Sequence, residues 1–260
     1  MKASSPRCAV PLLLPILTLC LAHSGRATTT AHQLSGGNFS QSWSSAGLIT
    51  ANDDWSGVPS IVGYRGDGGL GSGVDPQTVV ADSFSTVVDV IANQTNPNTL
   101  TTGGVSEFDT LTDPVVGFQG SGTADAPNLV IYLDSTGMQA VRVQYNLRDI
   151  DGSADDAIQP VALQYRIGTV GDFLNVPAAF IADATTGPGL SSLVTAIDVT
   201  LPTDADNVSD LQVRILTTNA VGNDEWVGID DISISATVIP EPASLILALA
   251  GFLPTLRRRR

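Results

Sequence analysis

Residues 139–148 read QAVRVQYNLR, and this stretch decides the fold. Apolar side chains occupy every second position, so that Val141, Val143, Tyr145 and Leu147 lie on one face of an extended chain. This period of two is typical of a strand with one buried face and one face in water. We therefore expect a half-buried β-strand here.

Similar segments lie on both sides of this strand. They have strand length, are separated by Gly, Pro and Asp, and cover residues 84–91, 115–119, 128–133, 161–167, 194–201, 211–217 and 226–238. None has a helical period, and residues 28–80 are rich in Gly, Ser, Asn and Asp, which predicts loops with short strands. The sequence predicts an all-β fold, an antiparallel β-sandwich of the jelly-roll type. We expect one such domain over residues 38–238, preceded by a flexible leader over residues 28–37.

The first 27 residues have the pattern of a secretory signal peptide. Lys2 and Arg7 precede an apolar run over residues 9–22, and small residues follow at Gly25 and Ala27. Both cysteines of the chain, at positions 8 and 20, lie in this segment. After its removal the domain has no disulfide, and its core alone must stabilise it.

The last residues form a second processing segment. Pro240, Glu241 and Pro242 precede an apolar run over residues 243–256, and the chain ends on Arg257, Arg258, Arg259 and Arg260. The run is shorter than the roughly twenty residues that cross a bilayer unaided, and Pro254 interrupts its helical hydrogen bonds. We expect a hydrophobic anchor helix that holds the protein at the membrane for a time.

Residues 239–260 resemble the PEP-CTERM sorting signal of Gram-negative bacteria that secrete exopolysaccharide. The Pro-Glu-Pro motif, the apolar run and the arginine cluster occur in the same order and at the same extreme end. The resemblance implies recognition by an exosortase-type membrane protease, removal of the tail, and delivery to the cell surface or the extracellular matrix.

The charge of the remaining chain excludes several partners. Between residues 28 and 239 it has five arginines, no lysine and 25 acidic residues, a net charge of about −20. Nucleic-acid phosphates and anionic lipid headgroups bind clustered Lys and Arg, so we expect neither as a partner. The membrane is then reached only through the terminal segments.

Two acidic stretches are candidate cation sites. Residues 148–157 read RDIDGSADDA and place Asp149, Asp151, Asp155 and Asp156 around a glycine turn. Carboxylate oxygens of this kind are the ligands that Ca²⁺ prefers. The EF-hand pattern fails, because its twelfth position is Pro160. An acidic turn satisfied by its own backbone amides explains the pattern equally well.

The second stretch reads GNDEWVGIDDISI over residues 222–234, with Asp230 and Asp231 inside an expected strand. Aspartate is unfavourable there unless a partner compensates its charge. The candidates are an arginine on a neighbouring strand (Arg142, Arg166 or Arg214), which we favour, or a cation shared with the first stretch.

More of the chain resembles one recurrent bacterial module. The blocks LITANDDWSGVPSIVGY (48–64), VVDVIANQTNPNT (87–99), YNLRDIDGSADDAIQPVALQYRIG (145–168) and TTNAVGNDEWVGIDDI (217–232) are similar to the N-terminal jelly roll of secreted esterases, phosphatases and nucleases. The closing IDDI is also similar to the ending of MAM and concanavalin-like modules. The resemblance implies a non-catalytic, ligand-binding or adhesive module, with an exopolysaccharide or another glycan as the expected ligand.

Few residues are left for catalysis. After the signal peptide the only histidine is His32, and no cysteine or lysine remains, which removes the usual nucleophile–base pairs and His-rich zinc sites. A glycosidase using Glu225 with Asp230 or Asp155 is the weakest alternative, and a purely structural matrix protein is the stronger one. For a sugar-binding face we expect exposed aromatic rings, and Trp43, Trp55 and Trp226 are the candidates, although burial in the core is the commoner outcome for a tryptophan.

Overall fold

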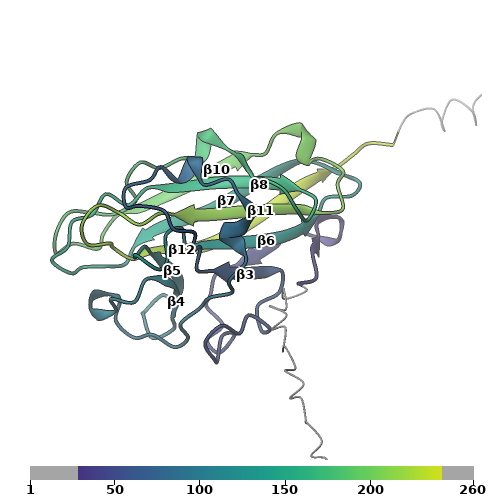
Figure 1. The fold of residues 1–260 in the computed structure, drawn as a ribbon. Coiled ribbons are helices and arrows are strands. Elements are labelled where there is room, and N and C mark those ends of the chain that lie inside the picture. The colour runs from purple at the N-terminus through teal and green to yellow at the C-terminus, as the bar shows by residue number, and fades with distance from the viewer. Residues whose placement is uncertain (1–28, 242–260) are drawn as a thin grey trace, which may run out of the picture.

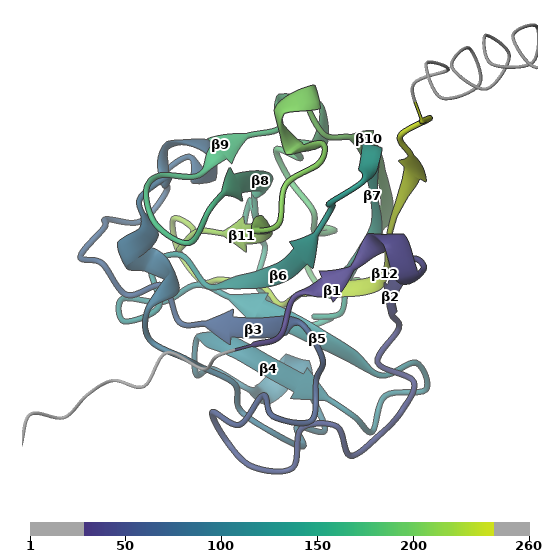
Figure 2. The same cartoon turned by 90° about the vertical axis from the view of Figure 1, so that its right-hand side faces the viewer.

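The computed structural model describes residues 29–241, so the expected signal peptide and the sorting residues from Pro242 onward lie outside the described part. Within residues 29–241, twelve strands form two six-stranded sheets that pack face to face (Figures 1 and 2). The predicted all-β sandwich is therefore confirmed. Among the described residues, no helix has the length and apolar character needed to cross a membrane.

The first sheet has the strand order β1-β6-β11-β8-β9, with β3 also paired to β6. Its strands are β1 (His32–Gln33), β3 (Ile61–Tyr64), β6 (Asn128–Asp134), β8 (Val161–Ile167), β9 (Leu174–Asn175) and β11 (Leu211–Thr217). Strands β1 and β3 pair with successive stretches of β6, β1 in parallel and β3 antiparallel. This arrangement places the start of the described chain beside β3.

The second sheet has the order β10-β7-β12-β5-β4, with β2 also paired to β12. Its strands are β2 (Phe39–Gln41), β4 (Gly104–Phe108), β5 (Val115–Gln119), β7 (Met138–Asp149), β10 (Val194–Thr200) and β12 (Val227–Val238). Strand β12 pairs first with β5 and then with β2, and its register against β7 shifts between Asp230 and Ser233. Asp231 has a φ of 48° at this shift, so it lies in a β-bulge.

The core lies between the sheets, and β7 shows how the sequence builds it. Val141, Val143, Tyr145 and Leu147 are at most 2% exposed, while Arg142 on the opposite face is exposed. The alternation expected from residues 139–148 is confirmed, because one face of the strand packs against the other sheet and the opposite face meets water.

The outer face of the first sheet differs from the expected wet surface. All of β11 is buried, and so is β8 up to Arg166. Short 3-10 helices η2 (Pro76–Thr78) and η3 (Asp82–Ser85), with the chain between them, cover this face (Figure 2). The remaining 3-10 helices of the described chain are η1 (Leu34–Gly36), η4 (Pro97–Thr99), η5 (Pro177–Ala179) and η6 (Thr203–Ala205).

Two local expectations also differ from the structure. The strand expected over residues 84–91 is replaced by the end of η3 and by isolated bridges at Val88 and Ile91. The stretch expected as a flexible leader instead contains β1 and η1, and Leu34 is only 3% exposed. Burial of Leu34 in the core explains why this segment is ordered.

Candidate functional site

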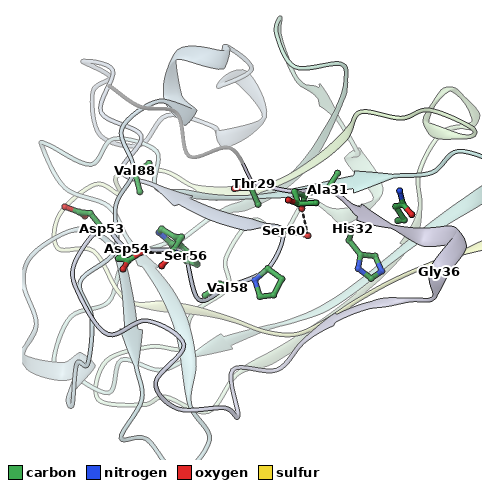
Figure 3. Close-up of a pocket in the computed structure, with 14 residues that line it drawn as sticks. Thr29, Ala31, His32, Gly36, Asp53, Asp54, Ser56, Val58, Ser60 and Val88 are labelled. Atoms are coloured by element: carbon green, nitrogen blue, oxygen red, sulfur yellow. Dashed lines mark hydrogen bonds between the residues drawn. The ribbon is translucent and has the colours of Figure 1, made fainter. Parts of the chain in front are cut away.

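A pocket of about 920 Å³ opens between the start of the described chain and the loop before β3 (Figure 3). One wall comes from residues 29–33 and the opposite wall from residues 53–60. Asp53, Asp54 and Ser56 lie at one end of the pocket and His32 at the other. The site therefore combines segments that only the pairing of β1 and β3 with β6 brings together.

Hydrogen bonds hold the two walls in place. Ser60 Oγ donates to the Thr30 carbonyl at 2.8 Å and joins one wall to the other. Asp53 fixes the loop to the chain beneath it, since its N–H donates to the Val90 carbonyl at 2.9 Å and its Oδ1 accepts the Val90 N–H at 3.2 Å. The pocket is thus built before a ligand arrives, which reduces the entropy lost on binding.

Trp55 anchors the loop from below. It is 5% exposed, and its Nε1 donates to the Asp89 carbonyl at 3.1 Å. Its ring lies directly against Gly63 of β3, where a Cβ would approach the ring to 2.3 Å, so only glycine fits there. This close contact fixes the distance between the loop of residues 53–60 and strand β3.

The rim of the pocket is polar and carries negative charge. Asp53, Asp54 and Ser56 are exposed, and Asp54 Oδ1 accepts the Ser56 N–H at 2.9 Å. Hydrogen bonds from Ser56 hold the pKa of Asp54 below its ordinary value. The rim of the pocket thus carries carboxylate oxygens and a serine hydroxyl. These groups can form hydrogen bonds with the hydroxyl groups of a ligand.

The His32 ring is a poor candidate for a general base, because its Nε2 contacts the Gly37 carbonyl at 2.9 Å and its ring packs on Phe39.

The three tryptophans do not form the exposed sugar platform that the sequence suggested. Trp43, Trp55 and Trp226 are 4%, 5% and 0% exposed, and all belong to the core. The indole N–H of Trp43 donates to the Ile229 carbonyl, and that of Trp226 donates to the Leu100 carbonyl. The expectation of exposed rings was wrong and the alternative of core burial holds, because indole rings gain most from full burial once their N–H has a partner. Trp55 nevertheless contributes to the lining of the pocket described above.

The first acidic stretch is divided between the interior and the surface. Asp149 and Asp151 are 5% and 2% exposed, and their carboxylates accept backbone N–H groups of Asp151, Thr186 and Ser153. Asp155 accepts from the Asn223 side chain at 2.7 Å. Within residues 29–241, no group of three or more His, Cys, Asp or Glu residues is placed to hold a metal ion. Calcium binding stays a prediction and forms one arm of the binding experiment below.

The second acidic stretch has a partner that the sequence did not identify. Asp230 is 1% exposed and accepts from Arg148 Nη1 at 2.6 Å, whereas Asp231 accepts from Asn146 Nδ2 at 2.9 Å. The favoured ion pair is therefore present, but it involves Arg148. The expected partners are engaged elsewhere: Arg142 with Asp198, Arg166 with Asp82, and Arg214 in the covered face of the first sheet.

Both carboxylate pairs considered for glycoside hydrolysis, Glu225 with Asp230 or with Asp155, contain Glu225, which is buried away from any substrate. Glu225 and Asp230 are each 1% exposed, and Asp230 is ion-paired to Arg148. A general acid and its partner must flank a sugar in a cleft. These two side chains are parts of the interior, so the geometry does not support that chemistry.

The sequence analysis missed the pocket residues Asp53, Asp54 and Ser56. The available signal was the run NDDWSG over residues 52–57, where carboxylates, an aromatic ring and a small turn residue occur together. That pattern identifies a turn, but it does not show that residues 29–33 form the opposite wall.

No protein-family model matches the chain, and no curated protein sequence matches it. Solved structures with some likeness include the K2 cleaved adhesin domain of Lys-gingipain, at 15% identity, with 77% of this chain and 98% of that chain covered and a TM-score of 0.40. A carbohydrate-binding module specific for non-crystalline cellulose shows 12% identity, coverage of 56% and 97%, and a TM-score of 0.35. A family 11 carbohydrate-binding module from Clostridium thermocellum, in complex with a β-1,3-1,4-mixed-linked tetrasaccharide, shows 12% identity, coverage of 54% and 85%, and a TM-score of 0.31. At this level of similarity, the ligands of these proteins carry no conclusion for this chain.

Proposed function

We propose that this chain is an exported, non-catalytic glycan-binding or adhesive β-sandwich that an exosortase system sorts to the cell surface or extracellular matrix. The observation that carries the binding proposal is the pocket of about 920 Å³, with hydroxyl and carboxylate groups on its rim. Carboxylates bind sugar hydroxyls through charge-assisted hydrogen bonds, which are stronger than neutral ones. The apolar faces of a sugar ring can lie against Pro59 and Val88, which also line the pocket.

The ligand is a neutral glycan rather than an acidic one. Asp53 and Asp54 lie at the rim, and the domain carries a net charge of about −20. No Lys or Arg lines the pocket within the described chain, so a uronic acid or sulfate group would find no counter-charge. Binding of a polyanion there would bury like charges together.

Glycan binding is tested on an array of neutral and acidic oligosaccharides, followed by titration calorimetry. We expect the purified protein to retain neutral oligosaccharides, and Asp54→Ala to weaken binding about tenfold, because one charge-assisted hydrogen bond contributes about 1.5–3 kcal/mol. Asp67→Ala is the matched control, since Asp67 is exposed and does not line the pocket. Each titration is repeated with added calcium and with chelator, and heat on addition of calcium alone would support the predicted cation at the acidic stretches.

The same experiment separates the alternatives. Preferential retention of acidic oligosaccharides, or equal loss in Asp54→Ala and Asp67→Ala, would contradict the pocket assignment. Absence of any glycan binding would favour the second candidate, a purely structural matrix protein. Release of reducing sugar from a retained oligosaccharide would overturn the non-catalytic assignment.

The sorting proposal has a separate test in a host that carries an exosortase. Replacing Arg257–Arg260 with serine should leave the protein unprocessed or misrouted, because the basic cluster resists entering the membrane and fixes the orientation of the tail. Immunoblot size and surface accessibility measure the effect, and Arg142→Ser should be processed normally. Unchanged mature size and surface delivery of the tail variant would show that the tail is not a sorting signal.

A further inference from the structure

A second hollowed region lies at the end of β11, in a loop cluster that does not contribute to the glycan pocket. Two hollows of about 530 and 510 Å³ lie side by side and share Asn219 and Ala220. Three segments, residues 72–76, 155–160 and 219–224, contribute to both hollows. We call this continuous region the loop groove.

Hydrogen bonds fix the loop groove in shape. The Gly73 N–H donates to the Asn219 carbonyl at 2.7 Å, and the Asn219 N–H donates to the Asp125 carbonyl at 2.9 Å. The Ala220 N–H donates to Asp224 Oδ1 at 2.7 Å and closes the loop on itself. These bonds come from separate segments of the chain, so the groove is present without a ligand.

One half of the loop groove exposes aliphatic side chains to solvent. Val221 is 76% exposed and Ile158 is 70% exposed, and both flank the same hollow. Phe180 is half-buried in this hollow beside Pro76 and Pro160. Large apolar side chains that gather around a concavity, instead of being scattered singly, mark a binding surface.

The other half of the loop groove offers acceptors and negative charge. Asp155 and Asp224 line it, and Asp75 and Asp156 line the apolar half. Gln119 is 7% exposed; its Nε2 donates to the Asp224 carbonyl at 2.8 Å, and its Oε1 has no hydrogen-bond partner in the described part of the chain. Within the described chain no Arg or Lys lines either hollow, so the surroundings favour a positively charged donor.

We propose that the loop groove binds a peptide segment of another protein in which an apolar side chain stands next to Arg or Lys. The apolar side chain enters the hollow beside Val221, Ile158 and Phe180, and the cationic side chain reaches the adjacent carboxylates. This assignment is independent of the glycan pocket. It also gives a role to Asp155 and Asp156, which the sequence analysis named as candidate cation ligands.

The test is fluorescence anisotropy with labelled peptides added to the full protein. The probe Gly-Arg-Leu-Arg-Gly should bind, whereas Gly-Glu-Leu-Glu-Gly and Gly-Arg-Ser-Arg-Gly should each bind at least tenfold more weakly. Affinity for the first probe should also fall several-fold as salt is raised, since exposed charges are screened. Val221→Ser and Asp156→Asn should each reduce that affinity about fivefold to tenfold.

Matched controls lie away from the loop groove. Val238→Ser removes an equally exposed valine at the far end of β12, and Asp210→Asn removes an exposed carboxylate that precedes β11. Both should bind the first probe as the unaltered protein does. Equal binding of the three peptides, equal loss in the controls, or displacement of the probe by a neutral oligosaccharide would overturn the proposal. The first two results leave the glycan assignment standing, and the Asp54→Ala titration decides that assignment on its own.

Discussion

Replacing Arg214 with leucine should lower the free energy of unfolding by about 4 kcal/mol. Arg214 is fully buried on the outer face of the first sheet. Its guanidinium donates to Gln164 Oε1, to the Val79 and Ala81 carbonyls and to Ser85 Oγ. Leucine would remove the donors that serve Gln164 Oε1 and the Ala81 carbonyl, and would leave the Val79 carbonyl with only the longer bond from Gln164 Nε2 at 3.4 Å. The segment containing η2 and η3 would then be held less firmly on the sheet.

The aromatic ring of Phe173 adds to this effect. Arg214 and Arg166 both stack on it, with guanidinium carbons 3.9 and 4.2 Å from the ring centroid. Burial, and then the nearby charge of Arg166, lower the pKa of Arg214 to about 9, so it remains charged at neutral pH. Lysine lacks the planar fork that serves several acceptors, so Arg214→Lys should recover little of the loss.

Urea denaturation measures the loss, and Arg142→Leu is the matched control. Arg142 also projects from a strand, but its side chain is half exposed and pairs with Asp198 at the surface. Surface pairs of this kind add little to stability, so the denaturation midpoint should barely move. Similar midpoints for the two variants would show that the covering segment does not depend on Arg214.

The covered face also shows where sequence periodicity stops being informative. Residues 139–148 predict β7 correctly, because the period of two records which side chains face the core. On β8 and β11 the same period places Gln164, Arg166, Gln212 and Arg214 on what looks like a wet face, yet each is at most 3% exposed. Their cover comes from residues 74–85, a distant and weakly apolar segment, and from residues 168–173, which include Phe173. Only the hydrogen bonds of the assembled structure make that burial favourable.

The candidate site is predictable only in part for a similar reason. Burial of the tryptophans follows from their size, but the wall opposite Asp54 comes from β1, whose two residues carry no strand pattern.

The partner of Asp230 depends on register: Gly228 faces Arg148, Asp230 faces Asn146, and the bulge at Asp231 follows. Arg148 therefore reaches Asp230 diagonally, and a sequence without the register cannot select it over Arg142.

Glu225→Gln should remove about 3 kcal/mol of pH dependence from the unfolding free energy between pH 4.5 and 8. Glu225 is 1% exposed; its Oε2 accepts the Ala157 N–H at 3.1 Å, and its Oε1 has no hydrogen-bond partner among residues 29–241. Burial raises the pKa of Glu225 from 4.5 to about 7, and the negative charges of Asp149 and Asp151 act in the same direction. The folded protein therefore holds a proton on Glu225 in a pH range where the unfolded chain has lost it.

The difference in bound protons decides whether the unfolding free energy rises or falls with pH. Because the folded-state pKa is raised, the contribution of Glu225 is fully present below about pH 4.5 and is lost as the pH rises through about 7. Glutamine keeps an acceptor for Ala157 and cannot ionise, so the variant should match the unaltered protein near pH 4.5 and exceed its stability at pH 8. Asp54→Asn is the control of opposite sign: the pKa of Asp54 is lowered, so its contribution is present above its unfolded pKa and fades only as the pH falls. Parallel stability curves for the unaltered protein and Glu225→Gln across this range would mean that the pKa of Glu225 is the same in the folded and unfolded protein, and would contradict this prediction.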